Sequence, residues 1–165
     1  MKTILVPTDF NVESTKIVDA LVQSQPNETL NIIFLHAFKL SDSITDMLML
    51  SRRSRDYENI SDEFYTQLNQ YKSKYTTQLN NIGIEYFYGS TVAAFKNFLE
   101  TLEVNCIAYP KAYDFKPINK YSINPKFLTE RSGCEVVHLN IMSVHNNENL
   151  IDTRIQELKL QEVSV

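Results

Sequence analysis

Met1-Lys-Thr-Ile-Leu-Val-Pro-Thr-Asp-Phe10 is the stretch of sequence that decides the fold. Its apolar run, residues 4–6, is too short for a buried helix and is rich in β-branched residues, so it predicts a central parallel strand. The run ends at the polar turn Pro7-Thr8-Asp9. A strand that ends in such a turn is typical of a doubly wound α/β sheet, in which ligands bind outside the carboxyl ends of the strands. We therefore expect Asp9 at the edge where a site would lie.

Further strands and helices alternate along the chain after this first strand. The other predicted strands cover residues 30–37, 84–88, 104–109 and 135–140, and the predicted helices cover residues 11–25, 44–50, 57–82, 91–102 and 126–132. Asn11 and Ser90 are the expected N-caps of two of these helices. The alternation predicts right-handed crossovers and a five-stranded, doubly wound parallel sheet with helices on both faces, which is a Rossmann-like α/β fold.

The longest predicted helix rests on a run of apolar and aromatic residues between Tyr57 and Ile82. They recur at steps of three and four residues, which is the periodicity of one amphipathic helix of about seven turns. Gly83 follows as the expected helix stop. By contrast, the stretch from Lys111 to Pro125 shows little periodicity and predicts a loop.

The 165 residues are expected to form one globular α/β domain over residues 1–142. A domain of this size buries roughly 70% of its unfolded surface, so its core needs no disulfide or metal. Residues 143–165 read as an appended tail that begins polar and ends with the spacing of a short amphipathic helix.

Composition excludes several classes of function. The formal net charge of −4 argues against a nucleic-acid partner, which requires a basic surface. Two cysteines without a paired motif and three scattered histidines predict no metal site. The sequence has no apolar run of the length that a membrane span or a signal peptide needs, so we expect a cytoplasmic protein that does not bind membranes.

Three places in this sequence resemble the universal stress protein family. Residues 2–10 resemble the first strand of the family and its acidic turn, and residues 30–37 resemble its second strand, which ends in a histidine. Cys134-Glu-Val-Val-His-Leu139 resembles its last strand, with Glu135 in place of the usual proline. The resemblance covers about residues 1–142 and implies a sheet with the strand order 3-2-1-4-5.

Members of this family that bind ATP carry a glycine motif after the fourth strand, and this chain lacks it. The motif brings bare backbone amides close to the phosphates. Its glycine positions fall here on Pro110, Tyr113 and Ile123, and its final serine or threonine falls on Asn124. Pro110 has no amide proton, and a tyrosine obstructs a close approach of the backbone. We therefore expect the fold without ATP binding in the usual manner of the family.

Candidate ligand-binding residues lie at the ends of the first two strands. Two interpretations of Asp9 stay open, a polar contact to a ligand and a cap of the following helix. Pro7 and Thr8 would contribute backbone contacts. His36, which precedes Ala37, either lines a pocket or is a hydrogen-bonded structural histidine.

Further candidates lie in the loop after the fourth strand. Lys111 is one of several lysines that either attract an anionic ligand without glycines or simply solvate the loop. We expect Tyr113 to close the pocket by packing into it. Asn124 stands where the glycine motif would place its hydroxyl residue.

No catalytic motif is present, whether a phosphate-binding loop, GxSxG, HExxH or paired carboxylates. We therefore expect a non-catalytic, universal stress-like regulatory or scaffolding protein, with a nucleotide hydrolase as the third class considered. The resemblance implies a homodimer through the last strand or the tail, and a further protein partner stays open. The alternative is a binding module for ATP, AMP or another small anion, which uses the loop after strand four. The scaffolding interpretation and the binding-module interpretation differ in whether that loop leaves a cavity or fills it with tyrosines.

Overall fold

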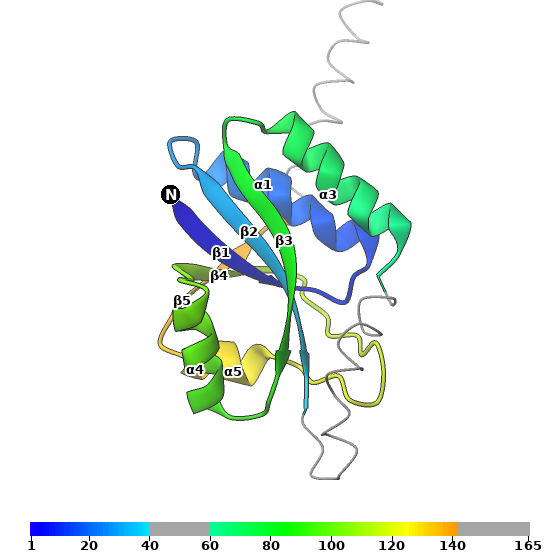
Figure 1. Ribbon diagram of the computed structural model, residues 1–165, viewed down its shortest axis with the longest axis vertical. Coiled ribbons are helices and arrows are strands. Elements are labelled where there is room, and N and C mark those ends of the chain that lie inside the picture. The colour runs from blue at the N-terminus through cyan, green and yellow to red at the C-terminus, as the bar shows by residue number, and fades with distance from the viewer. Residues whose placement is uncertain (40–59, 142–165) are drawn as a thin grey trace, which may run out of the picture.

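A computed structural model describes residues 1–39 and 60–141 of the chain. Its five strands form one parallel sheet with the order β3-β2-β1-β4-β5, which confirms the doubly wound α/β fold and the expected strand order (Figure 1). The strands are β1 (Lys2–Pro7), β2 (Leu30–Phe38), β3 (Leu79–Tyr88), β4 (Cys106–Pro110) and β5 (Glu135–Leu139). The first strand therefore lies at the centre of the sheet.

Helices cover both faces of this sheet. The helices α1 (Ile17–Ser24) and α3 (Asp62–Lys74) lie on one face, and α4 (Val92–Thr101) and α5 (Lys126–Arg131) lie on the other (Figure 1). A short 3-10 helix, η1 (Val12–Lys16), joins the turn after β1 to α1. Each helical layer packs against the sheet through an apolar cluster of its own.

Alternate residues of the central strands fill the two clusters. In β1, Ile4 and Val6 belong to the cluster under α1 and α3, whereas Leu5 belongs to the cluster under α4 and α5. All three side chains are at most 1% exposed. Successive side chains of a strand point to opposite faces, so a strand covered on both faces is apolar at nearly every position. This burial explains the unbroken apolar run at the start of the sequence.

The predicted seven-turn helix is wrong in its C-terminal part. Tyr75 caps the end of α3, and its N–H donates to the carbonyl oxygen of Tyr71 at 3.0 Å. The strand β3 then begins at Leu79. Gly83 is therefore not a helix stop but lies inside this strand, opposite Ile33 of β2.

Pairing with β2 explains why this segment forms a strand. In β3, Ile82 and Ile84 lie two residues apart and both pack against the cluster under α3. Threonines and asparagines at positions 76, 77, 80 and 81 are poor helix formers. The spacing of apolar residues alone fits both structures over so short a stretch. The hydrogen bonds to a neighbouring strand, which sequence periodicity does not reveal, favour the strand.

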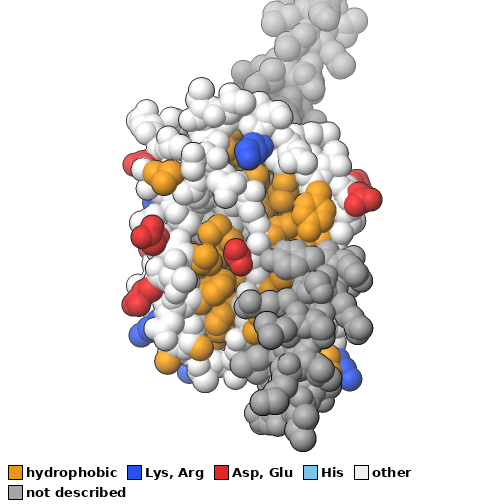
Figure 2. Space-filling view, in the orientation of Figure 1, with side chains coloured by type: hydrophobic (Ala, Val, Ile, Leu, Met, Phe, Trp, Pro, Cys, Tyr) orange, Lys and Arg blue, Asp and Glu red, His pale blue; other side chains and the backbone are white. Residues whose placement is uncertain are grey.

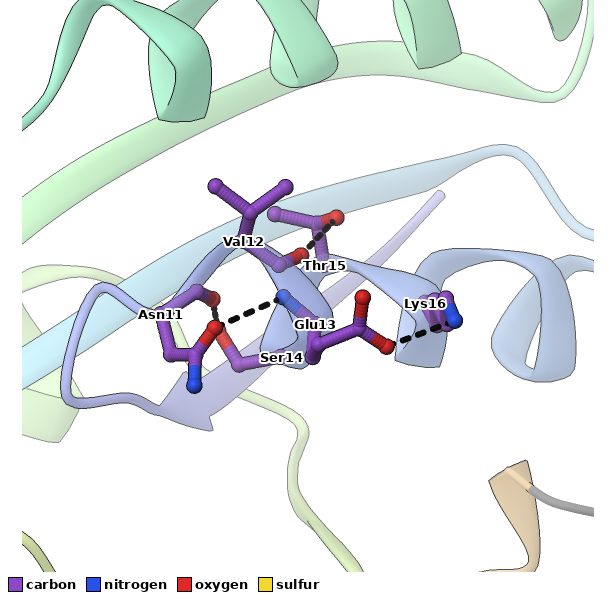
Figure 3. Close-up of polar contacts among 6 residues, drawn as sticks. All are labelled: Asn11, Val12, Glu13, Ser14, Thr15 and Lys16. Atoms are coloured by element: carbon purple, nitrogen blue, oxygen red, sulfur yellow. Dashed lines mark hydrogen bonds and ion pairs between the residues drawn. The ribbon is translucent and has the colours of Figure 1, made fainter.

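The structure places the helix caps to within one residue of the prediction. Asn11 is the N-cap of η1, as expected, and its side-chain oxygen accepts a hydrogen bond from the Glu13 N–H at 3.1 Å (Figure 3). At α4 the cap is Thr91 rather than Ser90, because Thr91 Oγ1 accepts from the Ala94 N–H at 3.2 Å.

Some predicted segments lie outside the described residues. They are the helix over residues 44–50, the start of the helix predicted from Tyr57, and the tail over residues 143–165. Among residues 1–39 and 60–141, no helix is both long enough and apolar enough to cross a membrane.

Candidate functional site

The hydroxyl group of Thr8 holds the turn that follows β1. This buried oxygen accepts a hydrogen bond from the Phe10 N–H at 2.9 Å and lies 2.8 Å from the hydroxyl oxygen of Ser14 in η1. The Thr8 N–H donates to the carbonyl oxygen of Leu35 in β2 at 2.8 Å. Phe10 has a φ of 63°, which costs energy in a residue with a side chain, and its buried ring packs edge-on against Phe64. These contacts fix the direction of the turn.

Asp9 is half-buried and lines a cavity at the carboxyl ends of the strands. Its Oδ1 accepts a hydrogen bond from the Asn11 N–H at 3.0 Å. Asn11 itself is the N-cap of η1, so Asp9 does not cap the helix. Asp9 instead stabilises the turn ahead of the helix and contributes a carboxylate to the wall of the cavity.

His36 connects three parts of the site. This side chain is 3% exposed; its Nδ1 lies 2.7 Å from the Thr8 carbonyl oxygen, and its Nε2 lies 2.8 Å from Ser122 Oγ. A carbonyl oxygen only accepts, so Nδ1 carries the proton. Ser122 Oγ accepts from the N–H groups of Ile118 and Asn119 at 2.9 and 3.2 Å, which leaves its own proton for Nε2. His36 is thus a hydrogen-bonded structural residue that also forms part of the cavity wall.

The loop after β4 is fastened to the sheet at both ends. At its start, the Lys111 N–H donates to the Leu139 carbonyl oxygen of β5 at 2.8 Å. Near its end, the Ile123 N–H donates to the Ala37 carbonyl oxygen at 3.0 Å, beside the bridge that pairs Ser122 with β2. The loop therefore runs across the carboxyl ends of the strands and forms one wall of the cavity.

Tyr113 lies on this wall without closing the cavity, so the expectation that it fills the pocket is wrong. Its ring packs edge-on against Tyr109, with the ring centroids 4.7 Å apart. That contact draws the ring against the sheet and leaves the space in front of it open. Burial, reinforced by the carboxylates of Asp9 and Asp114, raises the pKa of the Tyr113 phenol to about 12.

The cavity has a volume of about 350 Å³ and lies where β1, β2 and β4 end. Seven of the eight candidate residues from the sequence line it: Pro7, Thr8, Asp9, His36, Ala37, Lys111 and Tyr113. Asn124 does not line it; its side-chain oxygen accepts a hydrogen bond from the Lys126 N–H at 3.1 Å in the turn before α5.

Several other cavity residues carry no signal for ligand binding in the sequence. They come from η1 and the residue before it, from the loop, and from the two residues after β5: Asn11, Glu13, Ser14, Lys16, Asp114, Phe115, Asn140 and Ile141. Lys116, one of the loop lysines that the sequence offers for an anionic ligand, also lines the cavity. Lys16 is paired with Glu13, with a distance of 2.6 Å between the two charged groups (Figure 3). A lysine three residues after a glutamate in a helix is most simply explained by such a pair. In the residues that the structure describes, no group of three or more histidines, cysteines and carboxylates could hold a metal ion.

Comparisons with known proteins identify the fold. No family model and no curated protein matches this chain. Among solved structures, it is similar to the universal stress protein UspA from Lactobacillus plantarum, with 14% identity and a TM-score of 0.53 over 84% of this chain and 97% of the other. It is also similar to the hypothetical protein PH0823, with 16% identity and a TM-score of 0.52 over 84% and 95%.

A third similar structure is a universal stress protein in complex with cAMP, with 14% identity and a TM-score of 0.43 over 85% of this chain and 97% of the other. The first two likenesses have TM-scores above 0.5 and extend over most of both chains. This protein therefore has the fold of the universal stress proteins.

Proposed function

We propose that this protein is a non-catalytic regulatory module that binds a nucleotide, or another small anionic ligand, in the cavity at the strand ends. The observation that supports this proposal best is the open space of about 350 Å³ beside the loop after β4. Ligand pockets commonly have volumes of about 300 to 1,000 Å³ and are mostly apolar with a few polar groups. The cavity combines apolar residues such as Leu35 and Ala37 with charged residues such as Asp9 and Lys111.

The backbone of the loop supports a mode of binding that differs from a glycine-rich phosphate loop. Pro110 has no N–H, and the N–H groups of Lys111 and Tyr113 donate to carbonyl oxygens at 2.8 and 3.1 Å. An anion beside these three residues would therefore be held by side chains. Lys111 and Lys116 are both exposed and line the cavity, and neither forms an ion pair within the described part of the chain.

The arrangement of polar groups supports a non-catalytic role. Both ring nitrogens of His36 are held by hydrogen bonds to the Thr8 carbonyl and to Ser122, whose oxygen also accepts two backbone N–H groups. A general base needs a free nitrogen within reach of a reacting proton. We therefore expect no release of phosphate from nucleotides above the buffer background, with magnesium or manganese present.

Thermal unfolding with millimolar AMP, ADP or ATP tests the binding proposal. A ligand at 100 times its dissociation constant adds about 2.7 kcal/mol to the free energy of unfolding, which corresponds to a rise of about 5 to 10 °C for a chain of this length. We expect such a rise with at least one nucleotide. In the double variant Lys111→Ala/Lys116→Ala the rise should fall by more than half. Lys96→Ala, in the exposed part of α4, is the control and should show the same rise in unfolding temperature as the unaltered protein. Unchanged unfolding temperatures with every nucleotide would contradict the proposal that the cavity binds a nucleotide.

A second candidate function, scaffolding through self-association, is favoured by the position of β5. This strand lies at the edge of the sheet and pairs with β4 alone among the described strands. An open strand edge presents unpaired backbone groups and is usually covered. We propose that β5 of a second copy of this chain pairs with this edge.

A further inference from the structure

We propose that the cavity selects nucleotides with one phosphate and discriminates against those with two or three. This inference rests on the proposed function, because it specifies the ligand of the same cavity. It follows from the charges that line the cavity, from the state of the loop amides and from the apolar part of the wall.

The charges on the cavity wall balance. Three lysines and three carboxylates line it: Lys16, Lys111, Lys116, Asp9, Glu13 and Asp114. A site that favours a highly charged anion surrounds it with an excess of positive groups. Here the formal charge of the lining is zero, so each additional phosphate brings negative charge without a matching cation.

Only part of the positive charge is free to meet a ligand. Lys16 already forms an ion pair with Glu13, at 2.6 Å within one turn of η1. Lys111 and Lys116 remain, and both belong to the loop wall. A phosphate monoester carries a charge of about −1.5 to −2 at neutral pH, which these two lysines suffice to match.

Carboxylates lie on the same wall as these lysines. Asp9 and Asp114 both act on the phenol of Tyr113, whose ring is fixed against Tyr109. Both carboxylates therefore lie close enough to the Tyr113 hydroxyl to act on it. A polyphosphate that extended along this wall would meet two carboxylates, whereas a hydroxyl or amino group of a ligand would find acceptors there.

At the glycine positions of the family motif, the backbone offers no free amide that could offset this repulsion. The N–H groups of Lys111, Tyr113 and Ile123, which stand at the glycine positions or beside them, donate within the protein at 2.8, 3.1 and 3.0 Å. Phosphate loops rely on such groups being free.

The cavity offers apolar surface to the base of a nucleotide. Phe115 lies on the cavity wall nearly parallel to the ring of His36, with 17° between the two planes. The free energy gained by burying a nucleobase against such a surface is the same for a monophosphate and a triphosphate.

Calorimetric titration with AMP, ADP and ATP, and with the matching guanine nucleotides, tests the inference. The full chain is titrated at low salt with a chelator present, so that no magnesium masks the phosphate charge. We expect the monophosphate of at least one base to bind about tenfold or more tightly than its triphosphate, a difference of about 1.4 kcal/mol.

Two variants test the cause of the selectivity. Asp114→Asn removes one carboxylate from the wall at an exposed position, and should bring the affinities for triphosphate and monophosphate several-fold closer together. Glu100→Gln removes the same charge from the exposed surface of α4 and should leave their ratio unchanged. Equal changes in both variants would show that net charge, and not this wall, sets the selectivity, and would overturn the inference.

The outcomes separate the two proposals. Binding of a triphosphate as tightly as the monophosphate, or more tightly, would overturn the inference and leave the proposed function standing. No heat of binding and no thermal stabilisation with any of the six nucleotides would overturn both this inference and the proposal that the cavity binds a nucleotide.

Discussion

Glu103 ends α4 in a backbone conformation that glycine usually adopts. Its φ is 55°. Its N–H donates to the carbonyl oxygen of Glu100 at 3.1 Å, and the N–H of Val104 donates to that of Leu99 at 3.0 Å. These two bonds form a Schellman motif, in which the residue after the cap has a left-handed conformation. The sequence gives no sign of this motif, because a glutamate occupies the position.

We expect Glu103→Gly to raise the free energy of unfolding by about 1 kcal/mol, because glycine adopts a left-handed conformation without a steric penalty. Urea denaturation followed by circular dichroism measures the change. Glu100→Gly, three residues earlier and inside the helix, is the matched control and should lower stability by about 1 kcal/mol. If both substitutions were destabilising, the left-handed assignment of Glu103 would be incorrect.

At the residue scale, the sequence predicts those parts of the candidate site in which a polar residue ends an apolar strand. Asp9 and His36 stand out because polar residues at the ends of apolar strands lie at the edge where ligands bind. Ser122 was not predictable. Its hydroxyl group meets His36 only because the loop folds back over β2, across 86 positions of sequence.

At the element scale, β3 shows how a helix and a strand compete for the same residues. Figure 2, in the orientation of Figure 1, shows apolar side chains along β3 between α3 and α4. Ile82 and Ile84 of this strand are half-buried. Gly83 lies between them, and a Cβ atom added there would meet nothing within 4 Å. The glycine is therefore not required by crowding at this point of the strand.

We expect Gly83→Val to raise the free energy of unfolding by about 0.5 to 1 kcal/mol, since a β-branched residue favours the extended backbone of a strand. A residue that served as a helix stop would respond with a loss of stability instead. Gly89→Ala is the contrasting variant. Its Cβ would lie 2.9 Å from Cζ of Phe87, so this substitution should be destabilising in the same urea titration.

At the scale of the whole molecule, the position of β5 predicts self-association, because among the described strands it pairs with β4 alone. Glu135 and His138 are exposed on this strand. Light scattering at micromolar concentration should give a molar mass of about twice that of one chain if two copies pair edge to edge. His138→Glu adds a second carboxylate to the edge and should shift the mass towards that of one chain, because like charges across paired strands repel.

Asn97→Glu on α4 is the control for this experiment. It adds the same charge at an exposed position away from β5 and should leave the molar mass unchanged. A single-chain mass for the unaltered protein over the whole concentration range would exclude the dimer. It would leave the binding proposal unaffected, because the cavity is formed within one chain.

The sequence by itself determined the class of fold, because burial on both faces requires the apolar run of residues 4–6, and alternating helices require a parallel sheet. It also predicted a candidate site at the carboxyl end of that first strand, where the structure has a cavity. Tertiary structure alone decided that residues 79–82 join β3 and that Tyr113 packs against Tyr109 and leaves a cavity open. The first outcome depends on pairing with β2, and the second depends on a loop that the N–H groups of Lys111 and Ile123 hold to β5 and β2. These contacts join residues far apart in the chain, and their energies exceed the local preferences that a sequence pattern reports.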